Sequence, residues 1–295
     1  MFGIRSAVIS IGAAALCLTA GAQLKFSEIF INPPGNDNGF EYIELVSDVP
    51  NFQMTGYWVV IIEGDGTVAG VVDQALNLSA FSTGSNGMFL WRDAETVLCP
   101  SPESGTSLHV ADFVPDIENG TNTYLIARNF TGSVGMDLDT NNDGVLDLLP
   151  WDEVIDAVAW NENEAGERMY AAQLGGFEFP TGFNWTPDIA LRVCGEWVLS
   201  DTLGTGPGPW RLDDVRRFPA EALWSGYKVT PGSYNPTILG DVNGDGVVDD
   251  TDLALVLESF GSDNACLTAD INGDGVVDDT DLAIVLEAFG LSCGE

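Results

Sequence analysis

The sequence predicts two folded parts, an all-β antiparallel sandwich over most of the chain and a small α-helical module at the C-terminal end. Short apolar stretches alternate with clusters of turn-forming residues through the first part. Two near-identical segments follow, Asp241–Phe260 and Asp270–Phe289, and each carries apolar residues at helical spacing. Strand-length stretches in one part and a helical period in the other favour different folds for the two parts.

The first part has the composition of a turn-rich β domain. Clusters of Gly, Asn, Asp and Ser, such as residues 82–87 (STGSNG), separate the apolar stretches, and these residue types favour turns. Helical periodicity is scarce here, so the stretches are expected to pair as antiparallel strands. The expected strands are Phe26–Ile31, Tyr42–Val46, Tyr57–Ile62, Met88–Trp91, Thr123–Ala127, Val154–Trp160 and Leu191–Val193.

The C-terminal part is an internal repeat with an offset of 29 residues, and 17 of the 20 aligned positions are identical. Leu253, Val256, Leu257 and Phe260 are spaced i, i+3, i+4 and i+7, which predicts a helix with one apolar face. Glycines stop each helix, and the second copy repeats the pattern. The apolar faces of the two helices are therefore expected to meet.

Each copy opens with D-x-N-x-D-G-x-x-D-x-x-D, a calcium loop of the EF-hand kind. Calcium prefers six to eight oxygen ligands, and alternate residues of a tight loop can aim their oxygens at one centre. Glycine at position 6 permits the sharp turn. The expected ligands of the first loop are Asp241, Asn243, Asp245, the Val247 carbonyl, Asp249 and Asp252. Those of the second loop are Asp270, Asn272, Asp274, the Val276 carbonyl, Asp278 and Asp281.

Residues 238–295 hold 14 acidic residues and no Lys or Arg. Clustered like charges repel, so cation binding and folding of this part are expected to be coupled. The alternative is a pair of acidic turns that bind no ion.

A duplicated loop of this kind, with Asp at position 12 and one helix after each loop, resembles a type I dockerin over about residues 240–290. The resemblance implies an EF-hand-like domain that docks onto a cohesin-like or cell-surface protein. It also implies that loop positions 10 and 11, here Asp250-Thr251 and Asp279-Thr280, contact the partner. Near-identical halves imply a pseudo-twofold axis and two docking orientations. The chain lacks the basic residues that often follow in this family, and a calcium-stiffened cap or a surface-retention tag is the alternative.

The first part resembles a lamin-tail-like domain. The resemblance is carried by SEIFINPPGNDNGFEYIELVSD (27–48), YWVVII (57–62), the N-G and Y-L-I-A pair within 119–127, and TPGSYN (230–235). It implies an immunoglobulin-like sandwich without catalytic residues of its own, used as an interaction or structural module.

A third acidic loop lies within the first part. Asp139, Asn141, Asp143, the Val145 carbonyl and Asp147 occupy calcium-loop positions 1, 3, 5, 7 and 9. Position 12 is Pro150, so Asp152 or Glu153 would have to close the site. The loop is either a third calcium site or an acidic surface turn.

Met1–Ala22 is predicted to be a signal peptide, because Arg5 precedes a short apolar run and Ala20-Gly21-Ala22 forms an A-x-A cleavage site before Gln23. The chain is therefore expected to be secreted or at the cell surface, with no membrane association after cleavage. Four cysteines remain and are expected to form disulfides in an exported chain. Domain membership favours the pairs Cys99–Cys194 and Cys266–Cys293.

The formal charge of −35 excludes nucleic acid and anionic membrane surfaces as partners. His109 is the only histidine, which excludes a multi-histidine metal centre, and no G-x-S-x-G motif accompanies it. Glu28, Glu41 and Glu44 are expected on a solvated strand face.

The sequence thus predicts a signal peptide (1–22), a lamin-tail-like sandwich (23–235) and a dockerin-like domain (236–295). The expected function is that of an exported, non-catalytic calcium-binding protein. The alternative is an exported hydrolase of polysaccharide or phosphoester carried by its dockerin. A carboxylate pair in a cleft lined by some of Trp58, Trp91, Trp185 or Trp210 would favour the hydrolase. The pattern identifies neither a ligand of the sandwich nor an oligomeric state.

Overall fold

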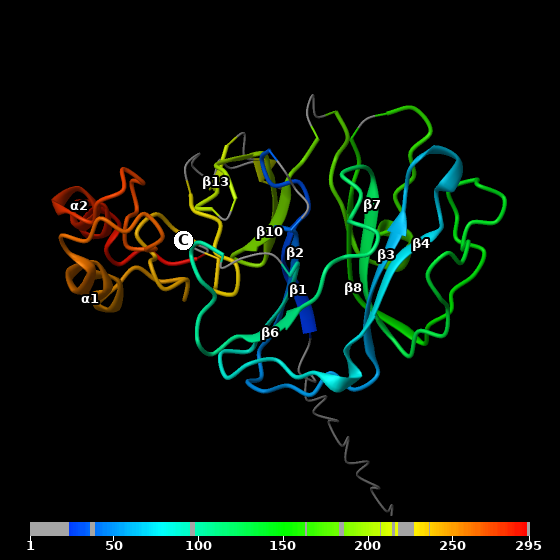
Figure 1. Ribbon diagram of the computed structural model, residues 1–295, viewed down its shortest axis with the longest axis horizontal. Coiled ribbons are helices and arrows are strands. Elements are labelled where there is room, and N and C mark those ends of the chain that lie inside the picture. The colour runs from blue at the N-terminus through cyan, green and yellow to red at the C-terminus, as the bar shows by residue number, and fades with distance from the viewer. Residues whose placement is uncertain are drawn as a thin grey trace, which may run out of the picture.

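The computed structural model describes residues 24–35, 39–94, 98–162, 164–182, 186–206, 208–213, 216–217, 227–235 and 237–293. The signal peptide predicted for Met1–Ala22, together with Trp185 and residue 236, lies outside the described residues. A β body (residues 24–235) is followed by a C-terminal module (residues 237–293) at one end of the molecule (Figure 1). No helix in the described part of the chain combines the length and apolarity needed to cross a membrane.

The described residues of the β body form two large sheets and a short ribbon. The seven-stranded sheet has the order β14-β11-β10-β1-β2-β5-β6, and the five-stranded sheet has the order β4-β3-β7-β8-β9. The larger sheet comprises β1 (Leu24–Phe30), β2 (Tyr42–Ser47), β5 (Met88–Arg92), β6 (Ser107–Val110), β10 (Ile189–Val193), β11 (Glu196–Ser200) and β14 (Arg216–Arg217). The smaller sheet comprises β3 (Tyr57–Glu63), β4 (Val72–Asn77), β7 (Asn122–Arg128), β8 (Glu153–Trp160) and β9 (Phe177–Glu178). The ribbon pairs β12 (Thr202–Leu203) with β13 (Arg211–Leu212), and three short 3-10 turns cover Gly66–Val68, Leu78–Ala80 and Ala172–Leu174.

The strands of the smaller sheet are covered on both faces. Val59 and Ile61 of β3 pack into the core between the sheets. Val60 and Ile62 point the other way and are buried under the loops that carry Leu138 and other apolar residues. Successive strand residues point to opposite faces, so burial of both faces explains why β3 is a continuous apolar run.

All seven strands expected from the sequence are present, and the body is sandwich-like. The sequence predicted antiparallel pairing throughout, but two pairs of strands, β5 with β6 and β8 with β9, are parallel. In both cases the second strand lies at the edge of its sheet after a long connection, and parallel pairing requires such a connection. The immunoglobulin-like and lamin-tail-like assignments remain predictions.

The prediction that Glu28, Glu41 and Glu44 lie on a solvated face is wrong. Glu28 and Glu44 are 0% exposed and Glu41 is 1% exposed. The segment that leads to the C-terminal module covers the face that carries Glu44, where the Gly232 backbone N–H donates to Glu44 Oε2 at 2.6 Å. Glu41 Oε2 instead accepts from the backbone N–H of Ile117 at 3.4 Å. The Tyr42 hydroxyl donates to Glu28 Oε1.

Burial determines the protonation of this pair of carboxyl groups. Glu28 and Glu44 are opposite each other on β1 and β2, and one buried oxygen of each has no hydrogen-bond partner among the described residues. Burial raises the pKa of Glu28 to about 7, although the bond from Tyr42 acts in the opposite direction. Burial and the neighbouring Glu28 carboxyl raise the pKa of Glu44 well above its usual value.

We expect Glu28→Gln to stabilise the protein at alkaline pH. The folded state holds a proton on Glu28 that the unfolded chain releases above its usual pKa of 4.5, so rising pH lowers the free energy of unfolding between pH 4.5 and 7. Glutamine carries no charge, and the variant should exceed the wild type by ~2–3 kcal/mol at pH 8 and match it near pH 4.

Urea unfolding of both proteins at several pH values measures this difference. Glu153→Gln, a change at an exposed residue of β8, is the control and should alter stability little. Parallel stability profiles for wild type and Glu28→Gln would contradict a protonated, buried Glu28.

The C-terminal module contains two helices, α1 (Asp250–Ser259) and α2 (Asp279–Ala288). Val256 of α1 and Val285 of α2 are fully buried in its core. Val248 pairs through its backbone with residues 290 and 291 after α2, and Val277 pairs with residues 261 and 262 after α1. The two halves are thus related by a pseudo-twofold arrangement.

The apolar faces predicted for the helices are only half buried. Leu253 and Val256 pack in the core, but Leu257 is 53% and Phe260 is 50% exposed. The corresponding residues of α2, Leu286 and Phe289, are also exposed. The row that contains Val256 or Val285 is therefore buried, and the row that contains Leu257 or Leu286 faces solvent.

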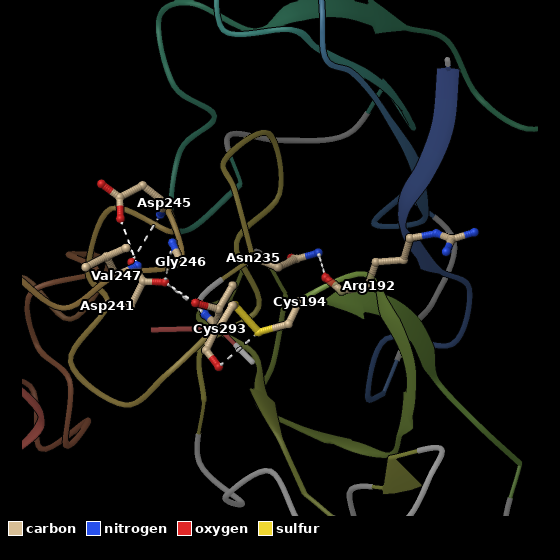
Figure 2. Close-up of a disulfide and its surroundings, with 9 residues drawn as sticks. Arg192, Cys194, Asn235, Asp241, Asp245, Gly246, Val247 and Cys293 are labelled. Atoms are coloured by element: carbon tan, nitrogen blue, oxygen red, sulfur yellow. Dashed lines mark hydrogen bonds between the residues drawn. A yellow bond between two sulfur atoms is a disulfide. The ribbon is translucent and has the colours of Figure 1, made fainter. Parts of the chain in front are cut away.

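The four cysteines form disulfides as expected, but the predicted pairs are wrong. Cys99 is bonded to Cys266, and Cys194 is bonded to Cys293. Both bridges join the β body to the C-terminal module, and Figure 2 shows the second beside the first acidic loop. Pairing by domain membership failed because the two parts pack together and bring cysteines far apart in sequence within bonding distance.

Candidate metal centre

The first loop folds around the carboxylate of Asp241, which is 2% exposed. The backbone N–H groups of Asp245 and Gly246 donate to its two oxygens, each at 3.1 Å. Asn243 Oδ1 accepts from Asp245 N at 2.9 Å. Asp245 Oδ1 accepts from Val247 N at 3.0 Å, and Figure 2 shows Asp245 and Val247 beside Asp241. This ladder curls the backbone and gathers the alternate side chains on its inner side, as a calcium loop requires.

Asp252, at position 12, ties the first loop to α1. It is 0% exposed, and its Oδ1 accepts from Val242 N at 2.7 Å and Asn243 N at 3.2 Å. Its Oδ2 accepts from Asp249 N at 2.9 Å, while the Asp249 side chain caps the helix by accepting from Thr251 N. One carboxylate thus closes the loop and completes the capping box.

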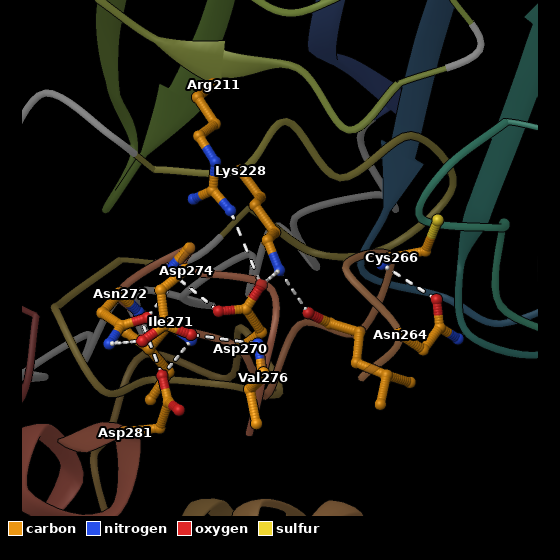
Figure 3. A network of polar contacts seen from close by, with 12 residues as sticks. Arg211, Lys228, Asn264, Cys266, Asp270, Ile271, Asn272, Asp274, Val276 and Asp281 are labelled. Atoms are coloured by element: carbon orange, nitrogen blue, oxygen red, sulfur yellow. Dashed lines mark hydrogen bonds and ion pairs between the residues drawn. The ribbon is translucent and has the colours of Figure 1, made fainter. Parts of the chain in front are cut away.

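The second loop repeats this closure. Asp281 Oδ1 accepts from Ile271 N at 2.6 Å and Asn272 N at 3.0 Å, and its Oδ2 accepts from Asp278 N at 2.9 Å. The surroundings of position 1 differ. Asp270 Oδ2 accepts from Lys228 Nζ at 2.9 Å, and the guanidinium of Arg211 is 3.7 Å away (Figure 3).

The donor set of both loops fits a calcium ion. Asp241, Asp252, Asp270 and Asp281 are all at least 98% buried, and each loop adds two further acids and an asparagine. Burial, followed by the neighbouring Asp252 carboxylate, raises the pKa of Asp241 despite its hydrogen bonds. Buried carboxylates of this density need a cation, and oxygen-only ligands at this spacing suit calcium.

The loop predicted at 139–147 has the same ladder as the first loop. Asp143 N donates to Asp139 Oδ1 at 3.1 Å and to Asn141 Oδ1 at 2.9 Å, and Gly144 N donates to Asp139 Oδ2 at 2.8 Å. Val145 N donates to Asp143 Oδ1 at 3.0 Å. Four hydrogen bonds therefore match those of the first loop position by position.

The closure of this third loop differs from the expectation. The Asp152 carboxylate accepts from Asn129 Nδ2 at 2.7 Å, and Glu153 lies in β8 opposite Arg128. Asp147 Oδ2 instead accepts from Thr140 N at 2.9 Å, the bond that position 12 makes with position 2 in the other two loops. Position 9 thus replaces position 12, and the loop is shortened.

The sequence did not predict a further group of carboxylates that lie close together in the structure. Oxygens of Glu63, Asp65 and Glu118 lie within 4.8 Å of one another, and so do those of Asp65, Glu162 and Glu167. Burial, followed by a hydrogen bond with Glu118, raises the pKa of Glu63 to about 8. These acids lie on separate segments, so no local motif marks them.

The residues implied to contact a partner are on the surface. Asp250, Thr251, Asp279 and Thr280 are exposed and lie in the first turns of α1 and α2. In Figure 1 both helices lie at the end of the molecule remote from the β sheets. The exposed Leu257 and Leu286 extend each of these surfaces along its helix.

The described tryptophans that were considered for a catalytic cleft pack against other apolar side chains. Trp91 and Trp210 are buried in core clusters, and Trp58 packs against Phe130. A cleft of about 390 Å³ is lined by Asp156, Arg192, Trp197 and others, but Arg192 binds Asp156 at 2.7 Å. The His109 ring lies against Phe81 in a tilted arrangement, with ring centroids 4.7 Å apart, and burial lowers the pKa of His109.

The comparisons with known proteins agree with the geometry of the C-terminal module. A family model described as the dockerin type I domain matches residues 239–289. The search of curated proteins and the search of solved structures found no match. Dockerin type I domains bind calcium and dock onto cohesin partners. Residues 239–289 of this chain, with their two acidic loops and two helices, form a dockerin type I domain.

Proposed function

We propose that the chain is an exported, non-catalytic calcium-binding protein whose dockerin attaches the β body to a cohesin-like or cell-surface partner. The observation that carries this proposal is the pair of equivalent surfaces on α1 and α2. Each surface combines an exposed Asp-Thr pair with an exposed leucine, Leu257 or Leu286, beside an acidic loop whose first and last carboxylates are buried. The β body is then the part of the protein that the dockerin displays.

Calcium is proposed at three places. The two dockerin loops share the ligand pattern and the closure by Asp252 or Asp281. The loop at 139–147 is proposed as a third site, because its four-bond ladder repeats that of the first loop. An ion there would hold a long surface loop against β8.

The alternative, a hydrolase delivered by its dockerin, has less support. Trp91 and Trp210 fill core positions and do not line a described cleft. The buried pair Glu28 and Glu44 lies under the segment that contains Gly232, where a substrate has no access. Asp156 is bound by Arg192. These placements support a structural or interaction role for the β body.

Binding to purified cohesin domains, measured with calcium and with chelator, tests docking. The full chain with intact disulfides should bind at least one cohesin in calcium only. Because the two surfaces are equivalent, Asp250→Lys with Thr251→Lys should leave binding nearly intact, whereas adding Asp279→Lys and Thr280→Lys should abolish it.

Asp263→Lys, a charge reversal at an exposed residue between the helices, is the matched control and should bind normally. Binding that survives the four-residue variant or the chelator would refute docking by these surfaces. Hydrolysis of a polysaccharide or phosphoester by the full chain would refute the non-catalytic part of the proposal.

A further inference from the structure

The two dockerin loops are near-identical in sequence, but the residues that contact them from outside the loops differ in chemistry. At position 1 of the first loop, Asp241 Oδ2 accepts from Thr237 N at 3.1 Å and from the Thr237 hydroxyl. At position 1 of the second loop, Asp270 Oδ2 accepts from Lys228 Nζ at 2.9 Å. The carboxylate at position 1 therefore accepts hydrogen bonds from a neutral residue in the first loop and from a cationic side chain in the second.

Position 4 shows the same contrast. A Cβ added to Gly244 in the first loop would lie 2.6 Å from Cβ of Tyr234, so a neutral side chain covers that glycine. A Cβ added to Gly273 in the second loop would lie 2.0 Å from the guanidinium carbon of Arg211. The second loop is therefore in contact with two cationic side chains of the β body (Figure 3).

The backbone pairing of the β body fixes the positions of these two cations. Arg211 of β13 and Lys228 form an antiparallel bridge, so they are directly opposite each other. Like charges in this arrangement destabilise a strand pair unless an anion compensates them. Asp270 supplies that anion, and Lys228 is held further by donating to the Leu267 carbonyl at 2.6 Å. The Lys228 side chain is 5% and that of Asp270 is 0% exposed, so solvent screens their interaction little.

We propose that Lys228, supported by Arg211, is an intramolecular counter-ion that makes the second loop the weaker of the two calcium sites. This inference rests on the proposed function, since it requires both loops to bind calcium. Lys228 neutralises part of the charge that attracts the ion and repels an ion bound beside Asp270. The first loop has no cation of the described residues within salt-bridge distance. Calcium therefore fills the first loop before the second.

Site-resolved calcium titration of the full chain tests the proposal. The backbone amide signals of Gly246 and Gly275, each at position 6 of its loop, report the two sites separately by NMR in calcium buffers. We expect the second site of the wild type to be ~10-fold weaker than the first. Lys228→Met should strengthen the second site by ~10-fold and leave the first unchanged.

The only other lysine of the described residues, Lys25 in β1, provides the matched control, and Lys25→Met should change neither site. Lys228→Arg keeps the charge and should keep the second site weak. If Lys228→Met does not fold, Arg211→Met should shift the second site in the same direction by a smaller factor. Equal affinities in the wild type, or an unchanged or weaker second site in Lys228→Met, would overturn the inference. If neither glycine signal responds to calcium, it is the proposed function that fails.

Discussion

Replacing Asp252 with alanine should abolish calcium binding at the first dockerin loop and unfold α1. The variant loses a proposed ligand of the ion and the acceptor of three backbone N–H bonds, from Val242, Asn243 and Asp249. It also loses half of the capping box that starts the helix. We expect calcium affinity at this loop to fall at least ~100-fold.

Calorimetric titration measures the lost site, and circular dichroism at 222 nm measures the lost helix. Asp250→Ala is the control, because Asp250 is an exposed neighbour in the same helical turn. An Asp252→Ala variant that binds calcium with wild-type affinity would show that the loop does not hold the ion through position 12. A helix that persists without calcium would show that ion binding and folding of the module are independent.

The parts of the structure that the sequence predicted correctly are local ones. Helix α1 starts at Asp250 because Asp249 caps it and Asp252 completes the box, and these residues lie within four positions of one another. The ladder of the 139–147 loop likewise depends on Asp139, Asn141 and Asp143 alone. Hydrogen bonds between residues so close in the chain follow from residue type and spacing, so they can be predicted from a single sequence.

Long-range contacts explain the failures. Alternation on β1 and β2 predicted a solvated face for Glu28 and Glu44, but residues almost 190 positions away cover that face, since Gly232 binds Glu44 at a separation of 188. The approach of Lys228 to Asp270 is equally invisible in the sequence, because neither residue has a partner nearby in the chain. Which segment covers a sheet is decided by packing of the whole chain, not by a local pattern.

The disulfide pairing also depends on contacts between residues far apart in the sequence. Cys99–Cys266 spans 167 residues and Cys194–Cys293 spans 99, and each crosses from the β body to the dockerin. A non-reducing digest should therefore yield the two linked peptide pairs that contain these cysteines. Peptides that link Cys99 to Cys194 would contradict the pairing.

Removing both bridges, by serine at all four cysteines, should free the dockerin from the β body when calcium is bound. Each bridge closes a long loop of the unfolded chain, so each double-serine variant should lower the free energy of unfolding by ~3–5 kcal/mol, as urea titration measures. Two kinds of link join the dockerin to the β body, the disulfides and the contact of Lys228 with Asp270. The serine variants separate their effects, because the contact of Lys228 with Asp270 persists without the bridges. With calcium bound, the charge of that contact opposes the ion, so the covalent links are what keep the dockerin fixed to the β body. A limited proteolysis experiment should accordingly release the dockerin from the four-serine variant and not from the wild type, and release from both would show that the bridges do not hold the two parts together.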